Sequence, residues 1–172
     1  GTFTLGGEID DVDMTITSGT LRTNGYSLGG NGSLGVLTNA GTMYINGGDT
    51  VTTATQVDGG GTFSFEVDSA AATGLLTVTG GAFDMTTSTI TAVVGTGNIA
   101  NGDEILIVDG SATIVGGPGG VATAVTESSF LWDFNIIDGT GVTAATDDTD
   151  MFLQVVVANT ISGAATTAGN LA

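Results

Sequence analysis

The sequence contains no cysteine, no histidine and no lysine, and Arg22 is its one basic residue. Without those side chains, the usual general bases and activated nucleophiles of enzymes are missing. A nucleic-acid-binding protein needs many lysines and arginines to displace counterions, and anionic membrane surfaces attract proteins through the same residues. We therefore expect no nucleic-acid partner. No apolar run reaches the roughly 18 residues of a membrane span, so we also expect no membrane insertion of this chain.

Paired carboxylates are the one catalytic chemistry that this composition leaves open, as in glycoside hydrolysis. An enzyme acting on an anionic polysaccharide would also need basic side chains to hold its substrate. Arg22 alone cannot do this for a polyuronate. We therefore expect that the protein is not an enzyme and that it carries no organic cofactor.

Residues typical of long helices are also scarce, whereas residues typical of strands and tight turns abound. The chain has 30 glycines and a single proline, and 41% of its residues are hydrophobic. Threonine and valine, both frequent here, favour the pleated backbone, and glycine supplies turns with positive φ. The apolar content suffices for a core, so the 172 residues predict one folded all-β domain.

Acidic residues dominate the charge: 18 Asp and Glu give a formal net charge of −17. Such a charge keeps a protein soluble but makes it repel itself, and salt or divalent cations relieve the repulsion. Two groups of carboxylates are dense enough to suit the oxygen ligands of Ca²⁺, namely Asp10, Asp11 and Asp13 beside Glu8, and Asp147, Asp148 and Asp150. Neither group has the spacing of an EF-hand. These six aspartates are the candidate calcium ligands, and solvated loops are the alternative interpretation.

An internal repeat is the most informative feature of the sequence. A glycine, a small residue, an apolar residue, a variable residue and a mostly apolar residue recur at intervals of 18, 22, 20 and 20 residues. The copies are Gly1–Leu5, Gly19–Thr23, Gly41–Ile45, Gly61–Phe65 and Gly81–Met85. A fixed period in this range indicates a solenoid, in which each repeat is one structural unit stacked on the last.

The alternation inside each copy predicts which side chains lie inside the coil. Stacking the strands places one ladder in the interior, made of Phe3, Leu21, Met43, Phe63 and Phe83. A second interior ladder consists of Leu5, Thr23, Ile45, Phe65 and Met85. The outward positions are Thr4, Arg22, Tyr44, Ser64 and Asp84. Segments such as Leu75–Thr79 supply the other sides of the coil, and Gly-rich segments such as Asp58–Gly60 supply its turns.

From about residue 93 the period loosens. Strands are predicted over 103–109, 130–136 and 151–157, and the second places Phe130, Trp132 and Phe134 on one face. A solenoid needs a cap over its terminal coil, and this aromatic-rich region fits that role. A stacking platform for sugars is the alternative interpretation of Trp132. The predicted organisation is therefore coils over 1–92, irregular terminal coils or a cap over 93–158, and a linker or flexible tail over 159–172.

The order of several blocks resembles the C-terminal part of autotransporter passenger domains of the pertactin type. The blocks are Leu28–Leu34, Leu37–Met43, Phe65–Ser69, Leu75–Ala82, Asn101–Asp109 and Asp150–Val157, and the tail Ala164–Ala172 resembles the linker that follows in that family. The resemblance implies a right-handed parallel β-helix located outside the cell or on a bacterial cell surface. Because the 172 residues include no translocator barrel, we expect either a passenger fragment or a stand-alone relative of that family. The segment Asn46–Val51 lacks the Pro-Gly turn common in such passengers.

These observations together favour a structural role over catalysis. We expect an extracellular β-solenoid that acts as a surface stalk or as a self-assembling subunit of a filament or sheath. The physical reason is that a solenoid ends in open sheet edges, here at Thr2–Leu5, which must be capped or paired. An adhesin module that binds a glycan or a host protein through its outer face is the alternative.

Overall fold

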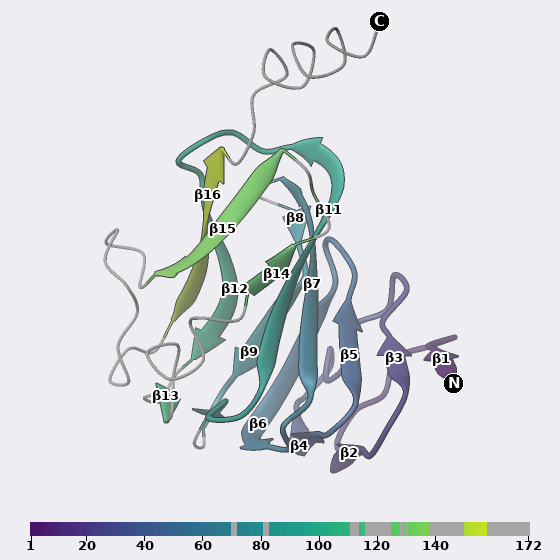
Figure 1. Cartoon of the computed structure of the whole chain (residues 1–172). Coiled ribbons are helices and arrows are strands. Elements are labelled where there is room, and N and C mark those ends of the chain that lie inside the picture. Colours follow the sequence, from purple (N-terminus) through teal and green to yellow (C-terminus); the bar gives the residue numbers. More distant parts are fainter. Residues whose placement is uncertain are drawn as a thin grey trace, which may run out of the picture.

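The computed structural model describes residues 1–69, 72–80, 83–110, 114–115, 125–127, 129, 131–137 and 150–157. Every regular element in these ranges is a β-strand (Figure 1). Within them, no helix is long and apolar enough to cross a membrane. The predicted all-β class is therefore confirmed.

The strands form two sheets that face each other across the core (Figure 1). Sheet A consists of β1 (Thr2–Thr4), β3 (Thr20–Arg22), β5 (Thr42–Ile45), β7 (Thr62–Ser69), β11 (Thr89–Asn98) and β14 (Val125–Glu127), with β8 (Ala72–Thr73) beside β7. Sheet B consists of β2 (Met14–Ile16), β4 (Leu34–Asn39), β6 (Thr50–Asp58), β9 (Leu75–Val78), β10 (Phe83–Asp84), β12 (Glu104–Gly110), β13 (Ile114–Val115), β15 (Trp132–Ile137) and β16 (Met151–Val157).

Parallel pairing and chain order distinguish this fold from a sandwich of antiparallel hairpins. The chain passes back and forth between the sheets, from β1 to β2, β3 to β4 and β5 to β6, so each of these three coils adds one strand to each sheet. In sheet A, the strands β1, β3, β5, β7, β11 and β14 pair in parallel in that order, and β8 pairs antiparallel with β7. The predicted parallel β-solenoid is confirmed.

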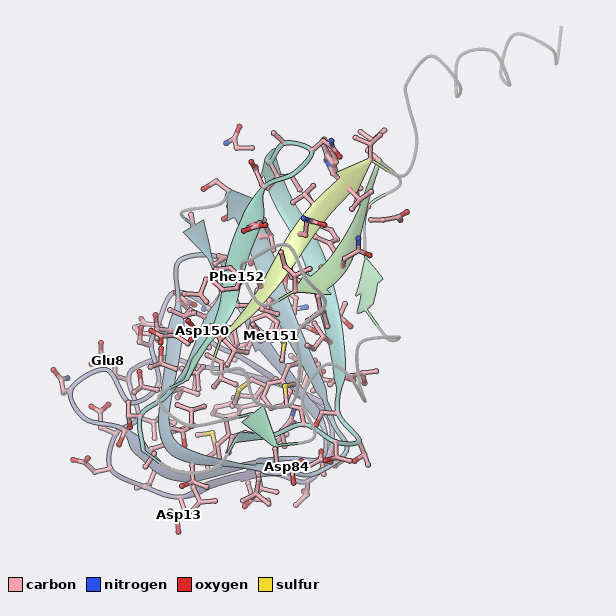
Figure 2. All side chains as sticks on the ribbon, turned by 90° about the vertical axis from the view of Figure 1, so that its left-hand side faces the viewer. Glu8, Asp13, Asp84, Asp150, Met151 and Phe152 are labelled. Carbon is pink, nitrogen blue, oxygen red and sulfur yellow. The ribbon has the colours of Figure 1, made fainter. Side chains whose placement is uncertain are left out.

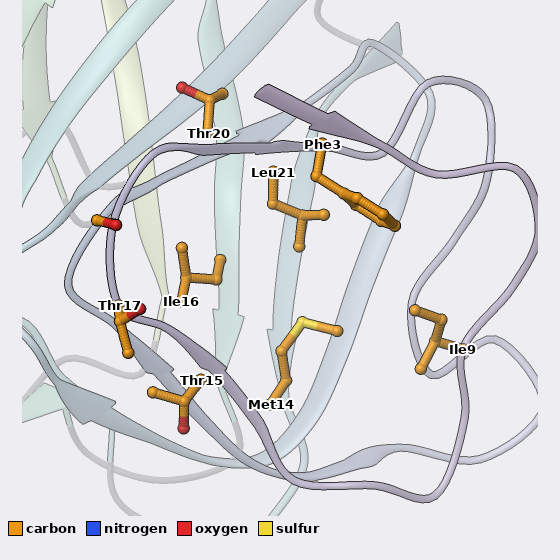
Figure 3. A pocket seen from close by; sticks show the side chains of 9 residues that line it. Phe3, Ile9, Met14, Thr15, Ile16, Thr17, Thr20 and Leu21 are labelled. Carbon is orange, nitrogen blue, oxygen red and sulfur yellow. The ribbon is translucent and has the colours of Figure 1, made fainter. Parts of the chain in front are cut away.

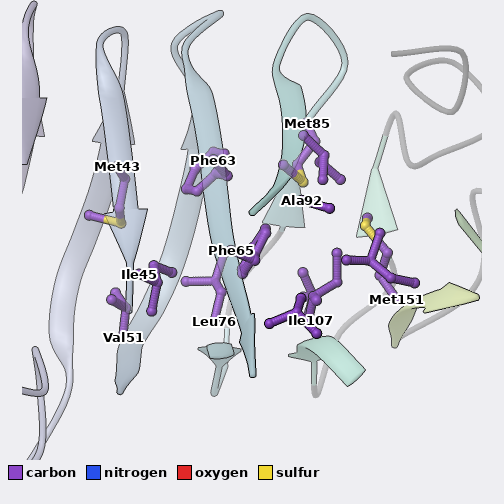
Figure 4. Close-up of a cluster of buried hydrophobic side chains, with 14 of the residues drawn as sticks. Met43, Ile45, Val51, Phe63, Phe65, Leu76, Met85, Ala92, Ile107 and Met151 are labelled. Atoms are coloured by element: carbon purple, nitrogen blue, oxygen red, sulfur yellow. The ribbon is translucent and has the colours of Figure 1, made fainter. Parts of the chain in front are cut away.

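The register brings the predicted interior ladder together. Leu21 pairs with Met43, and Met43 pairs with Phe63. Met43 and Phe63 are fully buried and Leu21 is 7% exposed, so the register stacks the three side chains in the core. Figure 4 shows Met43 and Phe63 on neighbouring strands. Full burial of each such side chain stabilises the fold by about 1.5–3 kcal/mol.

The fifth copy of the repeat does not continue this ladder, which corrects the prediction for Phe83, Asp84 and Met85. Ile90 of β11 pairs with Phe63, and Ala92 pairs with Phe65. Phe83 and Asp84 belong instead to β10 in sheet B, where Phe83 pairs with Gln56 of β6. Met85 is fully buried, but not above Phe65. The coil that begins at β7 is longer than the three before it, because Thr89 follows its partner Thr62 by 27 residues.

The outward positions also differ in one detail from the prediction. Thr4, Arg22, Tyr44 and Ser64 follow one another along the outer face of sheet A, and the next residue in that row is Thr91, not Asp84. Ser64 is only 6% exposed, since its short side chain lies between Tyr44 and Thr91 in the sheet.

The C-terminal end of the stack is closed by the predicted cap. β16 pairs antiparallel with β12, and β15 pairs antiparallel with β16. The hairpin brings β15 against β14 of the opposite sheet (Figure 1). Phe134 and Ile136 of β15 are 6% and 3% exposed and join the main core. The two sheets therefore converge at this end.

A column of glycines sets how closely the coils approach at one corner. A Cβ on Gly41 would lie 2.7 Å from the carbonyl oxygen of Gly19, and a Cβ on Gly61 would lie 2.5 Å from that of Gly41. Both distances are below any normal contact, and the obstructing atoms belong to the backbone. The small first residue of the repeat is therefore required by the distance between coils.

We expect Gly41→Ala to lower the free energy of unfolding by about 1–3 kcal/mol, because the backbone of two coils must separate to admit the methyl group. Gly7→Ala is the matched control, since a Cβ on Gly7 meets no atom within 4 Å. Urea unfolding followed by circular dichroism measures both variants. Equal stability of the two would contradict the close approach.

Candidate functional site

An apolar pocket opens at the N-terminal end of the solenoid (Figure 3). Its volume is about 290 Å³, and Phe3, Ile9, Met14, Ile16 and Leu21 are among its lining residues. Phe3 points into the space between β1 and β2, toward the end of the core (Figure 3). The pocket is thus the uncovered end of the same interior that is filled further along the stack.

Phe3 occupies the ladder position that is buried in the following coils. It pairs with Leu21, but its side chain is 63% exposed, whereas Leu21 is 7% exposed. The difference arises because no coil among the described residues lies over the first one. Of the predicted exposed end residues Thr2–Leu5, Leu5 is an exception, since it is only 3% exposed.

The strands around the pocket are the outer edges of both sheets. In the described part of the chain, β1 pairs only with β3, and β2 pairs only with β4. The Leu5 amide donates to the Arg22 carbonyl, and the Thr20 amide donates to the Gly1 carbonyl, both at 3.0 Å. Backbone groups alternate in direction along a strand, so those of Thr2 and Thr4 point away from β3. They offer hydrogen bonds to a further strand.

Sequence reasoning identified β1 as an open edge but missed the other wall of the pocket. Met14 and Ile16 alternate with Thr15 in β2, which is the signal of a half-buried strand. The segment lies outside the glycine-led repeat, and its three residues are too few to establish a period.

The N-terminal candidate calcium ligands are spread along the loop between β1 and β2. The Asp10 carboxylate accepts from the Asn31 amide at 3.4 Å, and the Asp13 carboxylate accepts from the Val36 amide at 2.8 Å. Asp11 lies over Gly32, where a Cβ would be 2.6 Å from its carboxylate oxygen. Figure 2 shows that Glu8 and Asp13 project at separate points of the periphery. The loop is thereby fastened to the next coil.

The C-terminal candidates are only partly described. Asp150 precedes β16, and its carboxylate accepts from the Gly110 amide at 3.2 Å (Figure 2). Asp147 and Asp148 lie outside the described residues. Over the ranges that the structure covers, no group of three or more acidic side chains is arranged to hold a metal ion. Calcium binding stays a prediction from the sequence.

The outer face of sheet A carries the single arginine. The Arg22 guanidinium carbon lies 3.9 Å from the centre of the Tyr44 ring, a cation–π contact between neighbouring coils. Partial burial and the negative charge of Glu66 raise the pKa of Tyr44, outweighing the opposite effect of Arg22. The Glu66 carboxylate also accepts from the side-chain amide of Asn46 at 2.7 Å. These contacts connect successive coils.

The predicted aromatic face of the cap contributes to packing. Trp132 is partly buried and packs against the main core beside Phe134, whereas Phe130 lies outside the described residues. The alternative interpretation of Trp132 as a sugar platform gains no support from this placement.

Asp58 connects the loop after β6 to the turn before β11. Its carboxylate accepts from the amide and hydroxyl of Thr87 at 2.6 and 2.8 Å, from the hydroxyl of Ser88 at 2.8 Å and from the amide of Gly60 at 2.9 Å. Partial burial on its own would raise the pKa of Asp58, but the hydrogen bonds from Gly60, Ser88 and Thr87 outweigh it and hold the pKa below its usual 3.8.

The comparisons with known proteins give no relative: no family model, no curated protein and no solved structure matches the chain.

We expect Asp58→Asn to destabilise the protein by about 1 kcal/mol at neutral pH, after allowing for solvent screening of this partly exposed site. A carboxyl group whose pKa is lowered by folding stabilises the folded protein at pH values above the pKa that the group has in the unfolded chain. This stabilisation is lost as the pH falls through the pKa of the group in the folded protein. The difference in unfolding free energy between the two proteins should therefore shrink below pH 3.8. Asp133→Asn, at an exposed position of β15, is the control. If the difference in unfolding free energy between Asp58→Asn and the parent protein does not change with pH, the hydrogen bonds of Asp58 are not the cause of its lowered pKa.

Proposed function

We propose that the protein is an extracellular structural β-solenoid without catalytic activity, acting as a surface stalk or as a subunit that assembles through its open end. The observation that carries the proposal is the contrast between the two ends of the stack. The C-terminal end is closed by β15 and β16, whereas the N-terminal end exposes Phe3 and an apolar pocket. Open solenoid ends tend to associate with other chains, because they combine free strand edges with an uncovered core.

The composition supports the absence of catalysis in this proposal. With no histidine, cysteine or lysine, general acid–base or nucleophilic chemistry would depend on carboxylates. Across the described ranges, the hydrogen bonds of the best-connected carboxylates, such as Asp58 and Glu66, run to backbone and side-chain groups of neighbouring coils. That is the arrangement of structural carboxylates.

Location at the cell exterior is supported by two properties of the chain. The surplus of carboxylates suits a saline or calcium-containing medium, which screens the repulsion. A chain without cysteine also needs no disulfide exchange after export. The resemblance of the sequence blocks to autotransporter passengers points the same way.

We expect the purified protein to self-associate as its concentration rises, because association covers the apolar end. Light scattering coupled to size-exclusion chromatography measures the mass, and electron microscopy shows the shape of the particles. Monomers at every concentration would count against an assembling subunit. Specific hits on a glycan array would favour the adhesin interpretation instead.

A further inference from the structure

Asparagine followed by glycine is prone to spontaneous deamidation, because glycine has no Cβ and its backbone turns freely. The glycine amide nitrogen attacks the side-chain carbonyl carbon of the asparagine and closes a five-membered succinimide ring. The side-chain nitrogen leaves as ammonia and takes the proton of the glycine amide with it. Water then opens one of the two ring C–N bonds and leaves aspartate or isoaspartate. The chain contains four such pairs, which begin at Asn24, Asn31, Asn46 and Asn101.

In two of these pairs, a short hydrogen bond holds the glycine amide that would attack. The Gly25 amide donates to the Asp49 carboxylate at 2.8 Å. The Gly102 amide donates to the Val155 carbonyl, also at 2.8 Å. A nitrogen held in this way must break its hydrogen bond and turn before it can approach a side-chain carbonyl carbon. The fold therefore protects both pairs.

In the pair Asn46–Gly47, both reacting groups are held. The Glu66 carboxylate accepts from the Asn46 side-chain nitrogen at 2.7 Å and from the Gly47 amide at 3.3 Å. The side-chain oxygen of Asn46 accepts from the Asn24 amide at 2.9 Å. The asparagine side chain is thus fixed between two neighbouring coils, and its carbonyl carbon cannot rotate toward the nitrogen without breaking these contacts.

The pair Asn31–Gly32 differs from the other three. The Gly32 amide donates to the Gly29 carbonyl at 3.4 Å, which is the longest of the four glycine contacts and exceeds the usual length of about 2.7–3.2 Å. Both residues of the pair are exposed in a turn. The Asn31 side chain donates to the Glu8 carboxylate at 3.0 Å, and Glu8 lies at the periphery (Figure 2). A carboxylate lies near each of the four pairs, so charge does not distinguish them.

We propose that Asn31 is the deamidation site of the folded protein, with the Gly32 amide as the nucleophile. The product replaces an amide that donates to Glu8 by a carboxylate that repels it. The Asn31 backbone amide also donates to Asp10 at 3.4 Å, so this residue connects the loop between β1 and β2 to the following coil. Deamidation adds one negative charge to the net charge of −17 and weakens this connection. The reaction needs only water, so the inference does not depend on the proposed function.

Incubation of the intact protein in mildly alkaline buffer tests the site. Chymotrypsin cleaves after aromatic residues and leucine, so cuts after Leu28 and Leu34 release Asn31 in a short peptide, and a cut after Tyr26 separates it from Asn24. Mass spectrometry follows the conversion of amide to carboxylate in each peptide, and a zero-time sample corrects for modification during digestion. We expect Asn31 to react at least about tenfold faster than each of the other three asparagines.

The unfolded protein and two variants separate the effect of the fold from that of the sequence. In urea the hydrogen bonds are lost, and the four pairs should react at similar rates. Asn31→Gln should abolish the modification at this position and leave the other three unchanged. Glu66→Ala removes the acceptor of both Asn46 and Gly47, so the rate at Asn46 should rise toward its rate in urea while the rate at Asn31 stays the same. Circular dichroism checks that this variant is folded.

Asn31→Asp tests the effect of the product on the loop, because it carries the same carboxylate. Asn24→Asp is the matched control, since it adds the same charge at another exposed turn. We expect hydrogen exchange in the loop between β1 and β2 to be about threefold faster in Asn31→Asp than in the parent protein, and unchanged in Asn24→Asp. Mass spectrometry after digestion at acidic pH measures the exchange of this segment.

The outcomes are distinct. Preferential modification of Asn31 in the folded protein, together with faster exchange of the loop in Asn31→Asp, supports the inference. Modification of Asn24, Asn46 or Asn101 at the rate of Asn31 in the folded protein would overturn the assignment of the site. An Asn31 that stays intact in the folded protein while it reacts in urea would do the same. Equal exchange of the loop in Asn31→Asp and in the parent protein would overturn the weakened connection between the coils.

Discussion

The parallel pairing of successive coils is the constraint on which the rest of the structure depends. It aligns Leu21, Met43 and Phe63 so that each side chain rests on the one before it. At the corner that precedes the strands of sheet A, successive coils approach so closely that the backbone has no room for a side chain, and this close approach accounts for Gly41 and Gly61. The repeat in the sequence thus results from one interaction, the parallel pairing of successive coils, which recurs in each coil.

That interaction also explains why the two ends of the molecule differ. Every interior coil is covered on both sides, whereas a terminal coil is covered on one side only. At the C-terminal end the chain reverses between β15 and β16, which pair antiparallel, and β16 pairs antiparallel with β12 while β15 contacts β14. At the other end no such reversal exists in the described chain, so Phe3 stays exposed although its position in the repeat is an interior one.

The sequence predicted the fold well where the period is regular and poorly where a coil is longer. The first four copies lie in the register that their spacing indicates. The fifth failed because Gly81–Met85 matches the pattern of the repeat while belonging to the opposite sheet, where Phe83 pairs with Gln56. A local five-residue pattern cannot reveal how many strands the preceding coil contains. The five-residue pattern by itself places Phe3 in the interior, and its exposure follows instead from its position in the first coil, as the predicted open end at Thr2–Leu5 indicates.

The negative charge has a structural use that a count of acidic residues does not reveal. Several carboxylates accept hydrogen bonds from backbone amides of an adjacent coil, as Asp13 does from Val36, Asp49 from Gly25 and Asp58 from Thr87. An exposed ion pair with lysine would contribute only about 0–1 kcal/mol and would leave both side chains free to move. A carboxylate bound to backbone amides instead fixes the position of a loop, because the donors cannot rotate away. A chain with almost no basic residues can therefore hold its coils together through its acidic residues. The repulsion between the remaining carboxylates acts at the surface and at the open end.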